Sequence, residues 1–209
     1  MRAFVLVCGL AAATAAFADP LPSWNQTDAK AAVIAFVERV TDPDSDDYVI
    51  PSERIATFDN DGTLWAEKPG YFQLLFAIDR LREMAKADPD ILSSEVLRAA
   101  ADGDFETVAA AGKDGLLEIV RTTHSGLSVD EFQAQARAWL DKARHPETKM
   151  AYDAMLYQPM LELLSYLRDE GFRTYIVSGG GLHFIRAFSE DAYNIPPEQV
   201  IGTTGNASY

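Results

Sequence analysis

Two aspartates separated by one residue follow a short apolar run in the stretch RIATFDNDGTLW, residues 54–65. Asp59 comes directly after the run, and Asp61 stands two residues further on, beside Gly62. Two carboxylates held this close tolerate each other when a divalent cation lies between them or when one of them keeps a proton. Either state supports chemistry, because one carboxylate can act as a covalent nucleophile while its neighbour transfers a proton. The alternative is a turn in which the two aspartates only cap backbone amides.

The sequence also offers groups that could receive an anion. In the first turn, Gly62 would let backbone amides approach the anion, and Thr63 adds a hydroxyl. A second polar turn, SGGG, begins at Ser178 and follows the apolar run RTYIV. This turn lacks the lysine of a P-loop and the glycine spacing of a dinucleotide-binding loop, and Ile176 stands where a nucleophile elbow needs glycine. A flexible connection between a strand and a helix is the alternative reading of SGGG.

Strands and helices alternate around these two turns. Apolar residues recur at the helical period behind a capping Thr27, and a later helix starts at Pro159 and ends at Gly171. Strands are predicted at 54–58, 173–177 and 200–202, helices at 27–40 and 181–192, and a loop at 194–199. The alternation predicts an α/β fold with a parallel sheet, in which ligands bind at the carboxyl ends of the strands.

A long helical block separates the two turns. From Gly70 to about Tyr157 only helical signals occur, and Ser128 and Glu131 have the spacing of a capping box. We therefore predict a helical insertion at residues 70–154, within a core made of residues 19–69 and 155–209.

At the two turns the sequence resembles the haloacid dehalogenase-like hydrolases. FDNDGT is similar to their first motif, an apolar strand followed by Asp-x-Asp-x-Thr, and YIVSGGG is similar to their second, a strand that ends in a phosphate-binding Ser or Thr. The helical block between Asp59 and Ser178 resembles the cap of the phosphoserine phosphatase-like members. The resemblance covers about residues 54–202, and it implies a Rossmann-like parallel sheet with the cap inserted between the first two motif strands.

The resemblance also implies a role for each matched residue. Asp59 would form an aspartyl-phosphate and bind Mg²⁺, and Asp61 would be the general acid and base and bind the metal through its backbone carbonyl. Thr63, Ser178 and the amide of Gly179 would hold the phosphoryl group. The implied activity is Mg²⁺-dependent hydrolysis of a small phosphate ester. Dehalogenase chemistry fits less well, because it does not need the second aspartate.

The third and fourth motifs of the family, a lysine and an acidic cluster, have no match after Ser178. The last lysine is Lys149, and the later acids fall in a predicted helix or loop: Glu190, Asp191 and Glu198. We therefore expect a truncated product or a fragment of a longer enzyme, with negligible turnover and with strand 54–58 left as an open edge that favours association. A phosphate-binding module and an inert fragment are the alternatives to an active phosphatase.

The composition and the N-terminus indicate which partners and which location to expect for the protein. The net charge of −14 argues against a nucleic-acid partner, because that affinity depends on Lys and Arg neutralising phosphates. Residues 1–18 read as a signal peptide that ends in the cleavage pattern Ala16-Phe17-Ala18, so a secreted or periplasmic protein is expected. An uncleaved membrane anchor is the alternative, although the apolar run is short for a spanning helix. Cys8 lies in this segment, and the mature chain would have no thiol.

Several other residues have no assigned role in catalysis. The three histidines show no zinc-ligand spacing, and His183 is expected on a helix surface near the site. The aromatic residues Trp65, Tyr71 and Phe72 are expected to pack in the core or the cap more often than to line the entrance. Glu67 lies in the segment where phosphoserine phosphatases carry an acid that reads the substrate ammonium, but its register is not fixed and no role is carried over.

Overall fold

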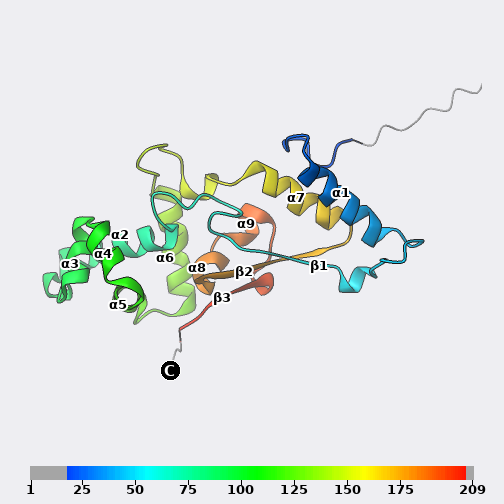
Figure 1. The fold of residues 1–209 in the computed structure, drawn as a ribbon. Coiled ribbons are helices and arrows are strands. Elements are labelled where there is room, and N and C mark those ends of the chain that lie inside the picture. The colour runs from blue at the N-terminus through cyan, green and yellow to red at the C-terminus, as the bar shows by residue number, and fades with distance from the viewer. Residues whose placement is uncertain (1–17, 206–209) are drawn as a thin grey trace, which may run out of the picture.

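The computed structural model describes residues 18–205, in which three strands form one parallel sheet in the order β1-β2-β3 (Figure 1). The strands are β1 (Ile55–Phe58), β2 (Arg173–Gly181) and β3 (Val200–Thr203). Phe58 pairs with Ile176, which in turn pairs with Val200. The predicted α/β class is therefore confirmed, and β1 lies at one edge of the described sheet, as expected.

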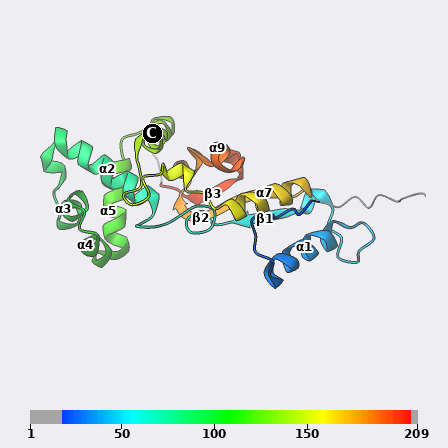
Figure 2. The same cartoon turned by 90° about the horizontal axis from the view of Figure 1, so that it is seen from above.

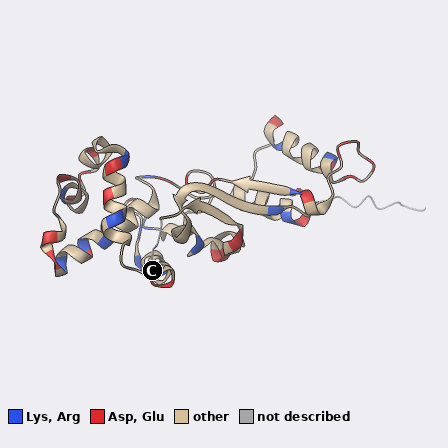
Figure 3. Cartoon of the chain, turned by 90° about the horizontal axis from the view of Figure 1, so that it is seen from below, with Lys and Arg blue, Asp and Glu red and all other residues tan. Residues whose placement is uncertain are grey.

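The helices of the core lie on one face of this sheet. They are α1 (Asp28–Thr41), α7 (Gln158–Asp169), α8 (Leu182–Arg186) and α9 (Ser189–Tyr193). Burial alternates along β2, so that Ile176 is fully buried while Val177 is 44% exposed. The opposite face of the sheet exposes apolar side chains from all three strands, and viewed from below it carries few charges along the strands (Figure 3). Those exposed side chains are Ile55, Val177 and Ile201.

The predicted insertion consists of helices, with one 3₁₀ turn between the first two helices and another after the last. The helices are α2 (Phe72–Ala87), α3 (Glu95–Asp102), α4 (Phe105–Ala110), α5 (Gly112–His124) and α6 (Val129–Lys142), and the 3₁₀ turns are Pro89–Ile91 and Tyr152–Ala154. The capping box of Ser128 and Glu131 is present at the start of α6, as predicted. These helices extend beyond the carboxyl ends of the strands (Figures 1 and 2). We call them the cap.

Two chain segments connect the cap to the core, and they lie side by side. The Ala66 N–H donates to the Met155 carbonyl at 3.0 Å, and the Tyr157 N–H donates to the Leu64 carbonyl at 2.9 Å. One apolar cluster continues from the cap into the sheet and contains Trp65, Phe72, Phe76, Ile176 and Phe184, all nearly inaccessible to solvent. This shared cluster packs the cap against the carboxyl ends of the strands.

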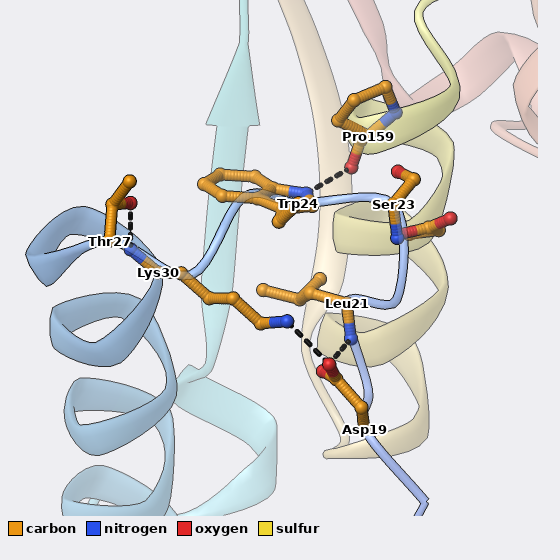
Figure 4. Close-up of polar contacts among 8 residues, drawn as sticks. Asp19, Leu21, Ser23, Trp24, Thr27, Lys30 and Pro159 are labelled. Carbon is orange, nitrogen blue, oxygen red and sulfur yellow. Dashed lines mark hydrogen bonds and ion pairs between the residues drawn. The ribbon is translucent and has the colours of Figure 1, made fainter.

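The segment at residues 19–24 docks on α1 and α7 (Figure 4). Leu21 is fully buried in a cluster with Val37 of α1 and Leu167 of α7. The Asp19 carboxylate accepts hydrogen bonds from the Leu21 N–H and the Lys30 amine, and the Trp24 indole N–H donates to the Pro159 carbonyl at 2.8 Å. We call residues 19–24 the N-terminal segment.

Most of the predicted signal peptide lies outside the described residues, as does Cys8. Only Ala18 of the cleavage pattern is described. Within residues 18–205, no helix combines the length and the apolar character that a bilayer crossing requires.

Some predicted elements differ in detail. The helix predicted at 181–192 is two short helices, α8 and α9, because the chain leaves the helical conformation at Phe188. The run SGGG continues β2 as far as Gly181, with an irregular register against β3. The loop predicted at 194–199 contains a 3₁₀ turn at Pro197–Gln199, and a further one at Pro51–Glu53 precedes β1.

The buried face of α1 also differs from its apolar pattern. Thr27 caps the helix as predicted, by accepting from the Lys30 N–H. Phe36, however, is 48% exposed, whereas Lys30 is buried. Lys30 is buried because its amine meets Asp19 of the N-terminal segment.

Candidate active site

The turn after β1 is organised around Asn60. Its side chain is buried and accepts a hydrogen bond from the Tyr193 hydroxyl at 3.0 Å. Its backbone carbonyl accepts from the N–H groups of Thr63 and Leu64, at 3.2 and 2.9 Å. Burial, and then the charge of Asp61, raises the pKa of Tyr193 well above its ordinary value, so the phenol stays a neutral donor. Asn60 thus anchors the turn between the two aspartates.

Asp59 and Asp61 have different surroundings. Asp59 is exposed, and its Oδ1 accepts the Asn60 N–H at 2.8 Å, which is the kind of local bond the turn alternative predicts. Asp61 is half-buried, and its Oδ1 accepts the Trp65 indole N–H at 2.8 Å. The second oxygen of Asp61, Oδ2, lies toward Gly180 of the second turn: a Cβ on Gly180 would stand 3.6 Å from it.

The surroundings of Asp61 raise its pKa. Burial raises the pKa of Asp61; the Trp65 N–H lowers it, and the charges of Asp59 and Glu67 raise it further. The Glu67 carboxylate packs on Gly62, where a Cβ would stand 3.0 Å from it, and Gly62 has a φ of +72° that other residues rarely adopt. Of the ion pairs between described residues, none includes Asp59, Asp61 or Glu67. The site therefore gathers carboxylates that no cation of the described residues pairs with.

The second turn supplies a hydroxyl group next to Asp61. Ser178 Oγ accepts the Gly180 N–H at 3.1 Å, which leaves the hydroxyl proton free to donate to an anion. A Cβ on Gly180 would stand 3.4 Å from Ser178 Oγ, so Ser178 and Asp61 flank the same glycine. The carbonyl of Gly179 accepts from the Thr203 hydroxyl at 2.9 Å. The parallel strands β1 and β2 thus bring the two predicted motifs together at the carboxyl ends of the strands.

The cap reaches this turn through Gln73. The Gln73 Oε1, in the first turn of α2, accepts the Gly181 N–H at 2.7 Å. A Cβ on Gly181 would overlap the Gln73 amide, so this contact requires glycine. Gln73 was not singled out in the sequence, and a partner 108 residues away leaves no local pattern that could have found it.

The remaining residues considered in the sequence differ in their burial. Trp65 and Phe72 are fully buried, which confirms the core packing expected for them, whereas Tyr71 is 57% exposed. His183 is half-buried instead of lying on the surface, and its Nδ1 is buried without a hydrogen-bond partner among the described residues. Burial, and then Arg186, lowers the pKa of His183. The Thr63 side chain makes none of the hydrogen bonds found among the described residues, so its role stays a prediction.

Asp59 and Asp61 are the candidate Mg²⁺ ligands of this site. Within residues 18–205, no three acidic, His or Cys side chains come together as a ready metal cluster. Mg²⁺ is, however, often held by one or two carboxylates with water and substrate phosphate completing its shell. Asp59 and Asp61, with Glu67 near them and no cation of the described residues paired with them, fit that mode of binding.

This chain is similar to one family model and to two solved structures. The model of a family described as haloacid dehalogenase-like hydrolase matches residues 56–208. No curated protein matches the chain. A phosphoserine phosphohydrolase-like protein from Francisella tularensis subsp. tularensis SCHU S4 is 20% identical over 74% of this chain and 61% of its own, with a TM-score of 0.39. A conserved protein of unknown function from Anaerococcus prevotii DSM 20548 is 17% identical over 83% of this chain and 67% of its own, with a TM-score of 0.48.

This chain spans less than two thirds of the length of the Francisella protein, and neither structural likeness bears on its activity. The family match is different in extent, because it covers most of the chain and includes both motif turns. The chain belongs to the haloacid dehalogenase-like hydrolases.

Proposed function

We propose that this hydrolase is a phosphomonoesterase that works through an aspartyl-phosphate on Asp59. One observation carries the proposal: Asp61 Oδ2 and Ser178 Oγ flank Gly180 at the carboxyl ends of two adjacent parallel strands. That edge is where α/β sheets bind their ligands. A carboxylate pair beside a hydroxyl with a free proton suits transfer of an anionic group better than a purely structural turn.

The proposed reaction has two steps. The exposed carboxylate of Asp59 attacks phosphorus, the bond from phosphorus to the ester oxygen breaks, and Asp61 gives its proton to that leaving oxygen. Water then attacks phosphorus of the acyl phosphate and gives a proton to Asp61. Inorganic phosphate leaves, and Asp59 is restored as a carboxylate. Burial, first of all, raises the pKa of Asp61, which is the direction of shift expected for a carboxyl group that acts as a general acid.

Mg²⁺ would be held by the Asp59 carboxylate and the Asp61 backbone carbonyl. When bound, the ion would neutralise charge on the phosphoryl oxygens and allow one anion to approach another. The hydroxyl of Ser178 would donate to a phosphoryl oxygen in the same region.

The substrate proposed is a small phosphate ester. The cap packs against the carboxyl ends of the strands through the cluster of Trp65, Phe72 and Phe184, so a ligand at that edge lies below cap residues. The net charge of −14 weighs against a polymeric anion as partner.

A phosphate-binding module without turnover is the second candidate. It is favoured by the ion pairs between described residues, none of which includes Asp59 or Asp61, because a cation usually stabilises the transferring phosphoryl group. Removing one such preorganised partner costs about 2.7 to 4 kcal/mol of transition-state stabilisation.

The test uses beryllofluoride, which mimics an acyl phosphate, together with phosphate release from a panel of small esters. With Mg²⁺ present, we expect a fluorine NMR signal of bound beryllofluoride that disappears in Asp59→Asn. The matched control is Asp46→Asn, in the exposed loop after α1, which should keep the signal. Ser178→Ala should weaken binding of both beryllofluoride and inorganic phosphate.

The outcomes separate the candidates. Bound beryllofluoride together with Mg²⁺-dependent phosphate release supports the phosphatase. A bound signal without release, at protein concentrations that would detect one turnover per hour, supports the binding module. A signal that survives Asp59→Asn refutes the nucleophile assignment.

We also propose export with cleavage after Ala18. The cleavage pattern Ala16-Phe17-Ala18 supports this proposal, and a chain that starts at Asp19 would keep the hydrogen bonds that Asp19 accepts from Leu21 and Lys30. Mass spectrometry of exported material should find Asp19 as the first residue, and an intact Met1 in a membrane fraction would favour the anchor instead.

A further inference from the structure

The indole of Trp65 is held rigidly against the turn that carries Asp61. Its ring stacks on Phe188 with centroids 4.3 Å apart and an interplanar angle of 18°, and the edge of Phe72 meets it at 4.8 Å. Its backbone carbonyl accepts the Gly62 N–H at 3.0 Å. Trp65 is fully buried, so neither its ring nor its backbone can move without disturbing this packing.

The buried indole has one polar atom, and that atom faces Asp61. The Trp65 Nε1–H donates to Asp61 Oδ1 at 2.8 Å. An indole N–H can only donate, so Oδ1 has to remain an acceptor. The other oxygen, Oδ2, lies toward Gly180 and the hydroxyl of Ser178, so it is the oxygen of Asp61 that is left to meet a ligand.

We propose that Trp65 is a positioning residue that orients the acid of this site: its indole N–H occupies Asp61 Oδ1 and presents Oδ2 to the leaving group. The inference rests on the proposed function, in which Asp61 protonates the ester oxygen. Core packing alone would be served by any large apolar side chain, whereas this role needs the N–H.

The first test removes the N–H and determines where the carboxyl points. In a crystal structure of Trp65→Phe we expect the Asp61 carboxyl to turn so that Oδ2 no longer faces Gly180. An unchanged orientation overturns the proposal, whether or not the protein turns over a substrate. If Trp65→Phe does not fold, 3-benzothienylalanine at position 65 keeps the ring volume and removes only the N–H.

The second test asks whether the N–H matters most when the leaving group needs a proton. The quantity compared is kcat/KM, because it reports the steps up to release of the alcohol and leaves out hydrolysis of the aspartyl-phosphate, which is common to both esters. On an alkyl phosphate such as β-glycerophosphate, we expect Trp65→Phe to lower kcat/KM about 10- to 100-fold. On p-nitrophenyl phosphate, whose leaving group departs without protonation, kcat/KM should change less than about 3-fold. Equal losses on both esters would mean a structural role only and would overturn the proposal.

Matched variants distinguish a failure of the proposed function from a failure of the present inference. Phe188→Leu disturbs the same aromatic packing without touching a hydrogen bond, so it should affect both esters equally. Asp61→Asn should show the same dependence on the leaving group as Trp65→Phe. If Asp61→Asn shows no such dependence, the proposed acid is wrong; if it does and Trp65→Phe does not, only the present inference is wrong. If the protein turns over neither ester, the orientation of the Asp61 carboxyl in the crystal structure of Trp65→Phe decides whether the proposal holds.

Discussion

Asp19 and Asp61 are the same side chain in opposite environments. Asp19, in the N-terminal segment, accepts hydrogen bonds from the Lys30 amine and the Leu21 N–H, and these contacts lower its pKa (Figure 4). Asp61 is half-buried beside other acids, and burial first of all raises its pKa. The first carboxylate is neutralised by its own chain and ties two elements together. The second is left for something else to neutralise, which is the property expected of a reactive group.

The largest effect should come from removing the acid of Asp61. Asp61→Asn keeps the shape and an acceptor for the Trp65 N–H but cannot transfer a proton. Turnover of an alkyl phosphate should fall by about 10² to 10⁴. Steady-state kinetics of this variant beside Asp46→Asn, which should behave as the parent protein, measures the loss. Parent-level turnover in Asp61→Asn would place the chemistry elsewhere.

The N-terminal segment should instead matter for stability. Leu21 is fully buried between α1 and α7, so Leu21→Ala should lower the free energy of unfolding by about 2–5 kcal/mol. Urea unfolding measures this change. Leu116→Ala, at a position 39% exposed in the cap, is the matched control and should lie within about 0.5 kcal/mol of the parent protein. A Leu21→Ala variant as stable as this control would mean that the N-terminal segment is only loosely attached.

The sequence predicts the strands and the motif residues better than it predicts the contacts around them. The apolar runs and their turns predict all three strands and bring Asp59, Asp61 and Ser178 to one edge of the sheet, because local pattern and parallel topology decide these features. The bond from Trp65 to Asp61 was not predicted, since an aromatic residue after a motif reads equally as packing. Asn60 and Tyr193 meet across 133 residues, and no local signal connects them.

The misread elements share a physical cause. The helix predicted at 181–192 breaks at Phe188, whose ring stacks on Trp65, a residue far from it in the sequence. Lys30 is buried on a face where an apolar period expects apolar residues, because Asp19 neutralises it. In both places a tertiary partner overrides the local pattern.

A smaller effect distinguishes the two aspartates by its sign. Asp19→Asn removes the charge that neutralises the buried Lys30 amine, so the midpoint of thermal unfolding should fall. Asp61→Asn relieves repulsion from Asp59 and Glu67, so its midpoint should stay level or rise. Differential scanning calorimetry at neutral pH compares the two variants. A fall in Asp61→Asn as large as that in Asp19→Asn would show that Asp61 also stabilises the fold.

The smallest expected effect is on the free energy of unfolding at acidic pH. The folded state holds the pKa of Asp19 below its ordinary value of 3.8, through the hydrogen bond from Lys30 and then that from Leu21. The unfolded chain therefore binds a proton at Asp19 before the folded chain does, and stability has to fall as the pH drops. This contribution is fully present above the unfolded value and is lost as the pH falls from about 3.8 through the lowered folded value. Urea unfolding of the parent protein and of Asp19→Asn between pH 6 and pH 3 should thus give curves that converge at the acid end. Curves that stay parallel over that range would mean that Asp19 is not ionically paired in solution.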